Sequence, residues 1–278
     1  MKANKHLFFL ILLCFITTAL FTNPIQADNR FVLNYQENEK EIIATTKHAE
    51  LHIEKDYLNK EEIYNAADKI EQGIRDLKEY LGEDYTKYNF GEMGKIEYII
   101  KSGDQYSNTI ISGGRIRLYH VHLKQSPYIH VTARILLDEN DFETPKPWLN
   151  IGMANYLGSI LADYPADLIG DKNSPDKLTK EIIKDEKYET VVEYFPERYY
   201  NNSAEKWAFA PLAGSFVKFI ENKYGKEKLL KLYQARRQGT DTISALEESS
   251  QEDMKSVKQI LGSSLKELKT EWLDSYKS

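Results

Sequence analysis

The chain has 278 residues, a net charge of −6 and a single cysteine, Cys14. This acidic balance opposes binding to nucleic acid or to anionic lipid, so we expect no nucleic acid partner. With one cysteine the chain cannot form an internal disulfide, so a hydrophobic core must hold it together. The length suffices for one domain or for two closely packed subdomains.

The first residues are expected to be removed before the protein acts. Lys2 and Lys5 precede an apolar run from Leu7 to Phe21, and the small residue Ala27 follows. This order is typical of a bacterial secretory signal peptide, here residues 1–27, whose loss removes two lysines and brings the net charge to −8. We expect a secreted or cell-envelope protein, with a membrane as partner only if the segment is retained as an anchor.

The first half of the remaining chain predicts short strands and one long helix. From Lys60 to Leu81 apolar residues recur every three to four positions, Asn59 and Glu62 fit an N-terminal capping box, and Gly82 fits the end of a helix. Alternation of apolar and polar residues predicts strands at Arg30–Tyr35, Glu41–Thr45, Ala49–Ile53, Lys95–Lys101 and Arg115–Leu123.

The remainder is predicted to be helical. Prolines at 127, 145 and 147 are typical of helix starts, so we expect a central pair of helices, one ending near Leu137 and one over Trp148–Leu161. Strands followed by helices predict an α+β fold with two subdomains, residues 28–162 and 163–278. The further helices are predicted at Asp176–Asp185, Ala204–Tyr224, Lys226–Arg237, Thr242–Glu248, Gln251–Leu261 and Leu265–Ser275.

Several short sequence motifs, in the order in which they occur along this chain, resemble those of the peptidase MA-like, gluzincin-type (thermolysin-like) metallopeptidase domains. Members of that family carry His-Glu-x-x-His on a first helix and Trp-Leu-x-Glu-Gly-x-Ala-x-Tyr on a second, followed by further helical phrases. This chain matches them at His130, Trp148-Leu149, Gly152, Ala154, Tyr156, Gly214–Val217, Tyr224-Gly225, Glu227 and Leu229. The resemblance implies that the central helices are a pair of the zincin type.

The residues that would perform the family's reaction are nearly all replaced. Two histidines at i and i+4 on a helix can share one zinc ion, a glutamate beside the first activates water, and a glutamate on the next helix is the third ligand. Laid over that pattern, His130 keeps the first ligand, whereas Val131 replaces the base, Arg134 the second histidine and Ile151 the third ligand.

These replacements predict that the chain binds no zinc at the family's site and has no catalytic residues there. Val131 cannot accept a proton, Ile151 has no lone pair, and Arg134 adds a permanent positive charge. Arg134 is expected either to be a solvated helix residue or to form an ion pair with Asp138 or Glu139.

Other histidine sets leave an alternative open. No His-Glu-x-x-His occurs in the chain, and the pair His48 and His52 has Ala49 in the place of the base, on an expected strand. His120 and His122 share one face of their strand and His130 follows on the next helix, so three imidazoles could converge on a metal. Zinc is expected as a cofactor only in that case.

Three hypotheses of function follow. The first is a secreted pseudopeptidase that binds peptide or protein along its cleft and its edge strand, with Arg115, Arg117, Tyr119, His120 and His122 as the binding residues. The second is a hydrolase with a substitute site built on His130 or on the three histidines. The third is a structural or interaction protein of the cell envelope.

Overall fold

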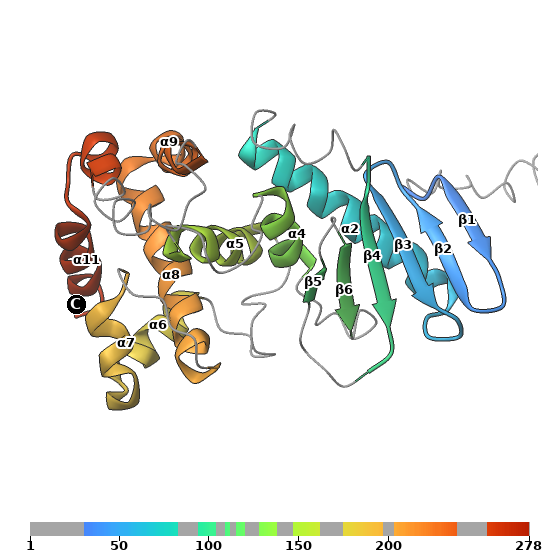
Figure 1. Ribbon diagram of the computed structural model, residues 1–278, viewed down its shortest axis with the longest axis horizontal. Helices are drawn as coiled ribbons and strands as arrows, with labels where there is room; N and C mark the ends of the chain where they lie inside the picture. Colours follow the sequence, from blue (N-terminus) through green and yellow to red (C-terminus); the bar gives the residue numbers. More distant parts are fainter. Residues whose placement is uncertain are drawn as a thin grey trace, which may run out of the picture. The chain divides into compact units, whose positions relative to one another are not determined.

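The computed structural model describes residues 31–82, 94–103, 109–111, 115–119, 128–137, 147–161, 175–196, 203–237 and 255–277. The expected signal peptide lies outside these residues. Residues Val32–Ser278 form one compact unit. The predicted α+β class is confirmed, because a mixed sheet with one long helix precedes a helical C-terminal half (Figure 1).

The described strands form one six-stranded sheet in the order β1-β2-β3-β4-β6-β5. Neighbouring strands are antiparallel, except that β4 runs parallel to both β3 and β6. The strands are β1 (Asn34–Glu37), β2 (Glu41–Thr45), β3 (Ala49–Glu54), β4 (Ile96–Lys101), β5 (Thr109–Ile111) and β6 (Arg115–Tyr119).

Two sequence predictions about the sheet are wrong. The first strand begins at Asn34 rather than at Arg30. The predicted edge strand is not an edge over Arg115–Arg117, because β5 pairs with β6 from Thr109 opposite Arg117 to Ile111 opposite Arg115. The edge beside β6 is therefore the three-residue strand β5, and the remainder of the predicted strand lies outside the described residues.

The long helix α2 (Lys60–Leu81) covers one face of the sheet. Its capping box is confirmed: the Glu62 backbone N–H donates to Asn59 Oδ1 at 3.0 Å, and the Asn59 N–H donates to Glu62 Oε2 at 2.8 Å. The helix ends at Gly82, whose φ of 85° favours glycine. In Figure 1, α2 passes behind the sheet, so the strands turn their other face to the viewer.

The two central helices are α4 (Tyr128–Leu136) and α5 (Pro147–Leu161), and they pack against each other. No described helix combines the length and the apolar character needed to cross a bilayer. The expected helix over residues 242–248 lies outside the described residues. The other helices are α6 (Pro175–Lys184), η2 (Glu186–Tyr188), α7 (Glu189–Tyr194), α8 (Ser203–Tyr224), α9 (Lys226–Arg237), a helix over 255–261, and α11 (Leu265–Asp274).

The helix α5 joins the sheet side of the molecule to the C-terminal helices through a very close contact with α8. A Cβ atom at Gly152 would lie 2.5 Å from the Ala213 carbonyl oxygen, and one at Gly214 would lie 2.9 Å from Asn155 Cβ. Distances this short exclude a larger side chain unless the backbones move apart. The glycine in the family-like phrase of α5 thus serves helix packing in this chain.

Candidate functional site

The four positions of the peptidase-like motif lie on the central helices. His130, Val131 and Arg134 are on α4 and Ile151 is on α5. His130 is only 6% exposed, and its ring forms a hydrogen bond with the Ala154 backbone on α5. The ring nitrogen Nδ1 is buried without a hydrogen-bond partner. His130 thus ties α4 to α5.

This environment makes His130 a poor base. Burial, followed by the nearby positive charge of Arg134, lowers the pKa of His130 to about 3. The ring is therefore neutral at neutral pH. A general base works best with a pKa near the operating pH, so His130 is badly matched to that task.

The other three motif positions also lack the chemistry of a zinc site. Val131 is 2% exposed and belongs to the core, and Ile151 packs against the core from the side of α5. Arg134 is half-buried, and its predicted partners Asp138 and Glu139 lie outside the described residues. Neither Val131 nor Ile151 can bind a cation or transfer a proton. The positive charge of Arg134 disfavours the binding of a metal cation beside it.

The predicted histidine triad remains a prediction, because His120 and His122 lie outside the described residues. Of the predicted binding residues on the strand, Arg115, Arg117 and Tyr119 are described. They alternate with the buried Ile116 and Leu118, so they point to the sheet face away from α2. Within the described part of the chain, no three histidine, cysteine or acidic side chains are grouped to hold a metal ion.

The state of His130 predicts a stability that falls in weak acid. An unfolded histidine gains its proton near pH 6.5, whereas folded His130 stays neutral down to about pH 3. The unfolded state therefore binds more protons between these values, and each pH unit below 6.5 costs about 1.4 kcal/mol of unfolding free energy. Urea unfolding at pH 7, 6 and 5 measures this slope.

The matched control is His130→Gln, whose amide keeps a donor for the Ala154 backbone but does not titrate. The variant is expected to lose most of the slope between pH 6.5 and 5, where ordinary carboxylates remain ionised. A His130 ring that titrates near pH 6.5 in NMR spectra of the folded protein contradicts the prediction.

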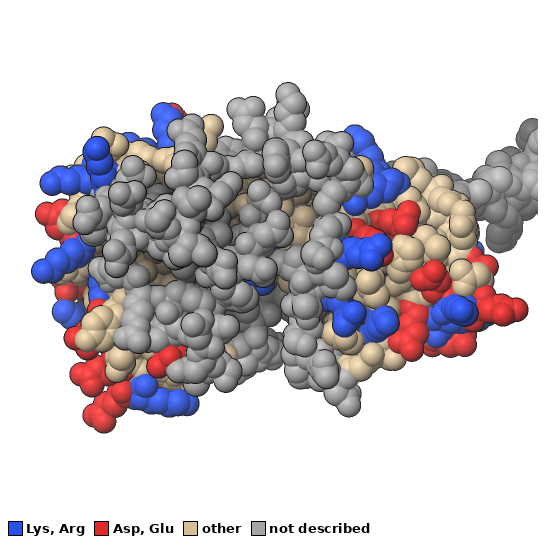
Figure 2. All heavy atoms as spheres, in the orientation of Figure 1, with Lys and Arg blue, Asp and Glu red and all other residues tan. Residues whose placement is uncertain are grey.

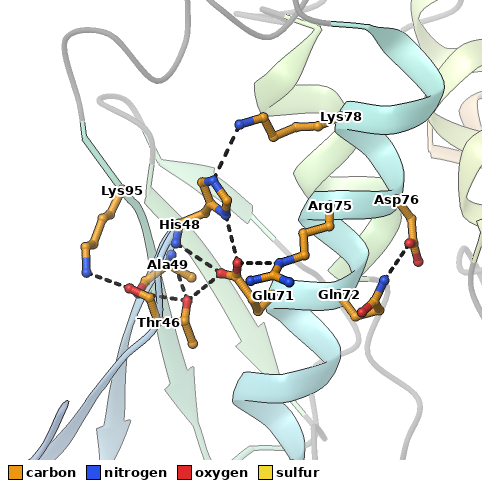
Figure 3. A network of polar contacts seen from close by, with 9 residues as sticks. All are labelled: Thr46, His48, Ala49, Glu71, Gln72, Arg75, Asp76, Lys78 and Lys95. Carbon is orange, nitrogen blue, oxygen red and sulfur yellow. Dashed lines mark hydrogen bonds and ion pairs between the residues drawn. The ribbon is translucent and has the colours of Figure 1, made fainter. Parts of the chain in front are cut away.

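A second polar cluster, which the sequence analysis missed, surrounds Glu71 on α2 (Figure 3). The fully buried Glu71 carboxylate accepts hydrogen bonds from Thr46 Oγ1 at 2.8 Å, from the His48 N–H at 3.0 Å and from Arg75 Nε at 3.0 Å. His48 Nδ1 lies 2.8 Å from its second oxygen. Burial acts to raise the pKa of Glu71, but these bonds outweigh it and lower the pKa.

The Glu71 cluster is a structural tie between the β2–β3 turn and α2. Each carboxylate oxygen has at least two partners, so the charge is compensated and both oxygens are occupied. The sequence does contain a signal for it: Glu71 lies among the apolar residues of the buried stripe, four positions after Ala67 and three before Ile74. A charged residue at such a position requires a partner.

A third cluster lies on the sheet face away from α2, where His52 stands between carboxylates. Its Nδ1 lies 3.1 Å from Glu41 Oε2 and its Nε2 lies 2.9 Å from Glu50 Oε1. Burial acts to lower the pKa of His52, but the bonds to Glu50 and Glu41 raise it overall. Both ring nitrogens face an acceptor, so the geometry suits the protonated imidazolium.

Of these three sites, His130 is the one that the peptidase-like motif singles out, and the other two are ion-pair networks between elements of the fold. Comparisons with protein-family models and with curated proteins find no match to this sequence.

Proposed function

We propose that this protein is a secreted, catalytically inactive metallopeptidase-like protein that binds an extended peptide without cleaving it. The observation that carries the proposal is the state of His130. The one ligand position that the motif keeps is buried, and its ring is already engaged by the Ala154 backbone. Val131 and Ile151 occupy the positions of the base and of the third ligand.

Peptide binding is supported by the edge of the sheet. Among the described strands, β5 is the last one on this side of the sheet, and an edge strand is the place where an added strand can pair. Pairing of this kind uses main-chain hydrogen bonds and needs no catalytic residue. A chain that has no chemistry at the motif positions can therefore still bind a peptide.

The inactivity is tested by metal content and peptidase assays on the purified protein. After incubation with zinc and removal of excess metal, we expect far less than ~1 zinc per chain and no zinc-dependent cleavage of a fluorogenic peptide. The physical reason is that a single buried imidazole cannot hold the ion. Stoichiometric zinc that is lost in His130→Ala would contradict the proposal.

A designed variant tests the resemblance itself. Arg134→His with Ile151→Glu supplies a second histidine at i+4 and a carboxylate from α5, so the variant is expected to bind ~1 zinc per chain if the helices have zincin geometry. Adding His130→Ala to this variant is the matched control and should abolish binding. A folded double variant that binds no zinc would speak against the family resemblance but not against inactivity.

A further inference from the structure

Arg117 on β6 has no counter-charge among the residues that the structure describes. Its Nε is buried without a hydrogen-bond partner, and its guanidinium forms no hydrogen bond or ion pair with the residues that the structure describes. Two other described arginines contrast with it: Arg75 is 3.0 Å from Glu71, and Arg115 is 2.6 Å from Glu97. A partly buried charge that lacks a partner destabilises a fold, so its presence calls for an explanation.

Within the described part of the sheet, the register neighbours of Arg117 do not supply an anion. The register places Ile99 beside it on β4 and Thr109 beside it on β5, with Arg115 and Tyr119 two positions away on β6. The nearest carboxylate in register, Glu97, is already bonded to Arg115. Figure 2 shows this face, with acidic and basic side chains over the strands.

The residue is nevertheless placed to meet a ligand. Arg117 is only partly buried, and it is one strand away from β5, the last of the described strands on that side of the sheet. A strand added to that edge would place one residue opposite Thr109, on the same face of the sheet as Arg117 and two strand spacings from it, about 10 Å. An arginine and a glutamate side chain together span that separation.

We propose that Arg117 selects peptides with an acidic side chain at the position opposite Thr109. This inference rests on the proposed binding of a peptide at β5 and adds the class of ligand. The guanidinium fork is suited to a carboxylate, which it can hold through two parallel hydrogen bonds. Charge complementarity thus favours an acidic peptide over a neutral or basic one.

The first test needs no ligand. Arg117→Met keeps the apolar length of the side chain and removes the uncompensated charge, so the free protein is expected to melt at a higher temperature than the unaltered one. The matched control is Arg115→Met on the same strand, which breaks the pair with Glu97 and should not raise the melting temperature. A lower melting temperature for Arg117→Met would show that the residue is structural and would overturn the inference.

The second test uses defined peptides. Six fluorescein-labelled, C-terminally amidated hexapeptides of alternating threonine and valine carry one glutamate, each at a different position, and six matched peptides carry glutamine instead. Fluorescence anisotropy is expected to give about tenfold to hundredfold tighter binding for the glutamate peptide in the correct register, because bonds between charged groups are the strong ones. Arg117→Gln should remove that preference, whereas Arg115→Gln should keep it.

The outcomes separate the two proposals. Equal binding of glutamate and glutamine peptides leaves peptide binding intact and overturns the role of Arg117. Loss of the preference in Arg115→Gln but not in Arg117→Gln overturns it as well. A third outcome is that none of the twelve peptides binds, while free glutamate or phosphate raises the melting temperature of the unaltered protein but not that of Arg117→Met. This result would assign Arg117 to a small anion and would count against the peptide.

Discussion

Replacing Glu71 by alanine is expected to lower the free energy of unfolding by about 3–5 kcal/mol, because the change leaves several donors, among them buried ones, without their acceptor. Thr46, the His48 backbone and Arg75 would each lose the acceptor that they now share. The loss would fall on the junction between α2 and the β2–β3 turn. Urea unfolding at pH 7 measures it.

Two variants make this experiment specific. Glu79→Ala changes an exposed glutamate on the same helix and is expected to stay within about 0.5 kcal/mol of the unaltered protein. Glu71→Gln keeps the shape of the side chain but has only one acceptor oxygen. Its loss of unfolding free energy should therefore lie between those of Glu79→Ala and Glu71→Ala. The pKa of Glu71 is lowered in the fold, so its stabilisation is present above the unfolded pKa and is lost as the pH falls through the folded value. Equal stability of both glutamate-to-alanine variants would contradict the assignment.

Trp272→Ala is the second change with a large expected effect, about 3–5 kcal/mol of unfolding free energy. Trp272 on α11 is 1% exposed, and its ring centroid lies 5.2 Å from that of Phe195 and 5.3 Å from that of Phe216. Its indole N–H donates to Ser215 Oγ at 3.1 Å. The truncation would leave a large cavity between α8 and α11.

Thermal and urea unfolding of Trp272→Phe provide the comparison. Phenylalanine keeps an aromatic ring in the cluster but loses the bond to Ser215, so we expect a smaller cost, about 1–2 kcal/mol. If Trp272→Ala costs no more than Trp272→Phe, α11 is not held by this cluster.

The local signals in the sequence predicted the regular elements well. The helix from Lys60 to Leu81 has the predicted bounds because its cap, its apolar stripe and Gly82 all act within a few residues of one another. The strand β5 could not be predicted in this way. A strand of three residues is defined by its pairing with β6 and has no alternation of its own long enough to recognise.

In the candidate site, too, some features follow from the local sequence and others from contacts between distant elements. Which residues occupy the motif positions can be read from the sequence, and so can the chemistry that they lack. The bond from the His130 ring to Ala154, and the missing partner of Arg117, depend on how separate elements meet. Glu71 is an intermediate case, because its place in an apolar stripe is visible in the sequence, whereas its partners Thr46 and His48 lie 25 and 23 residues away.

The close contact of α5 and α8 at Gly152 and Gly214 bears on how a ligand would be received. Two helices whose backbones touch cannot slide or bend past each other without a steric clash, so the joint between the sheet side and the C-terminal helices is rigid. We therefore expect no hinge at the contact between α5 and α8. A peptide at β5 would meet a preformed surface and would pay no cost for rearranging the joint.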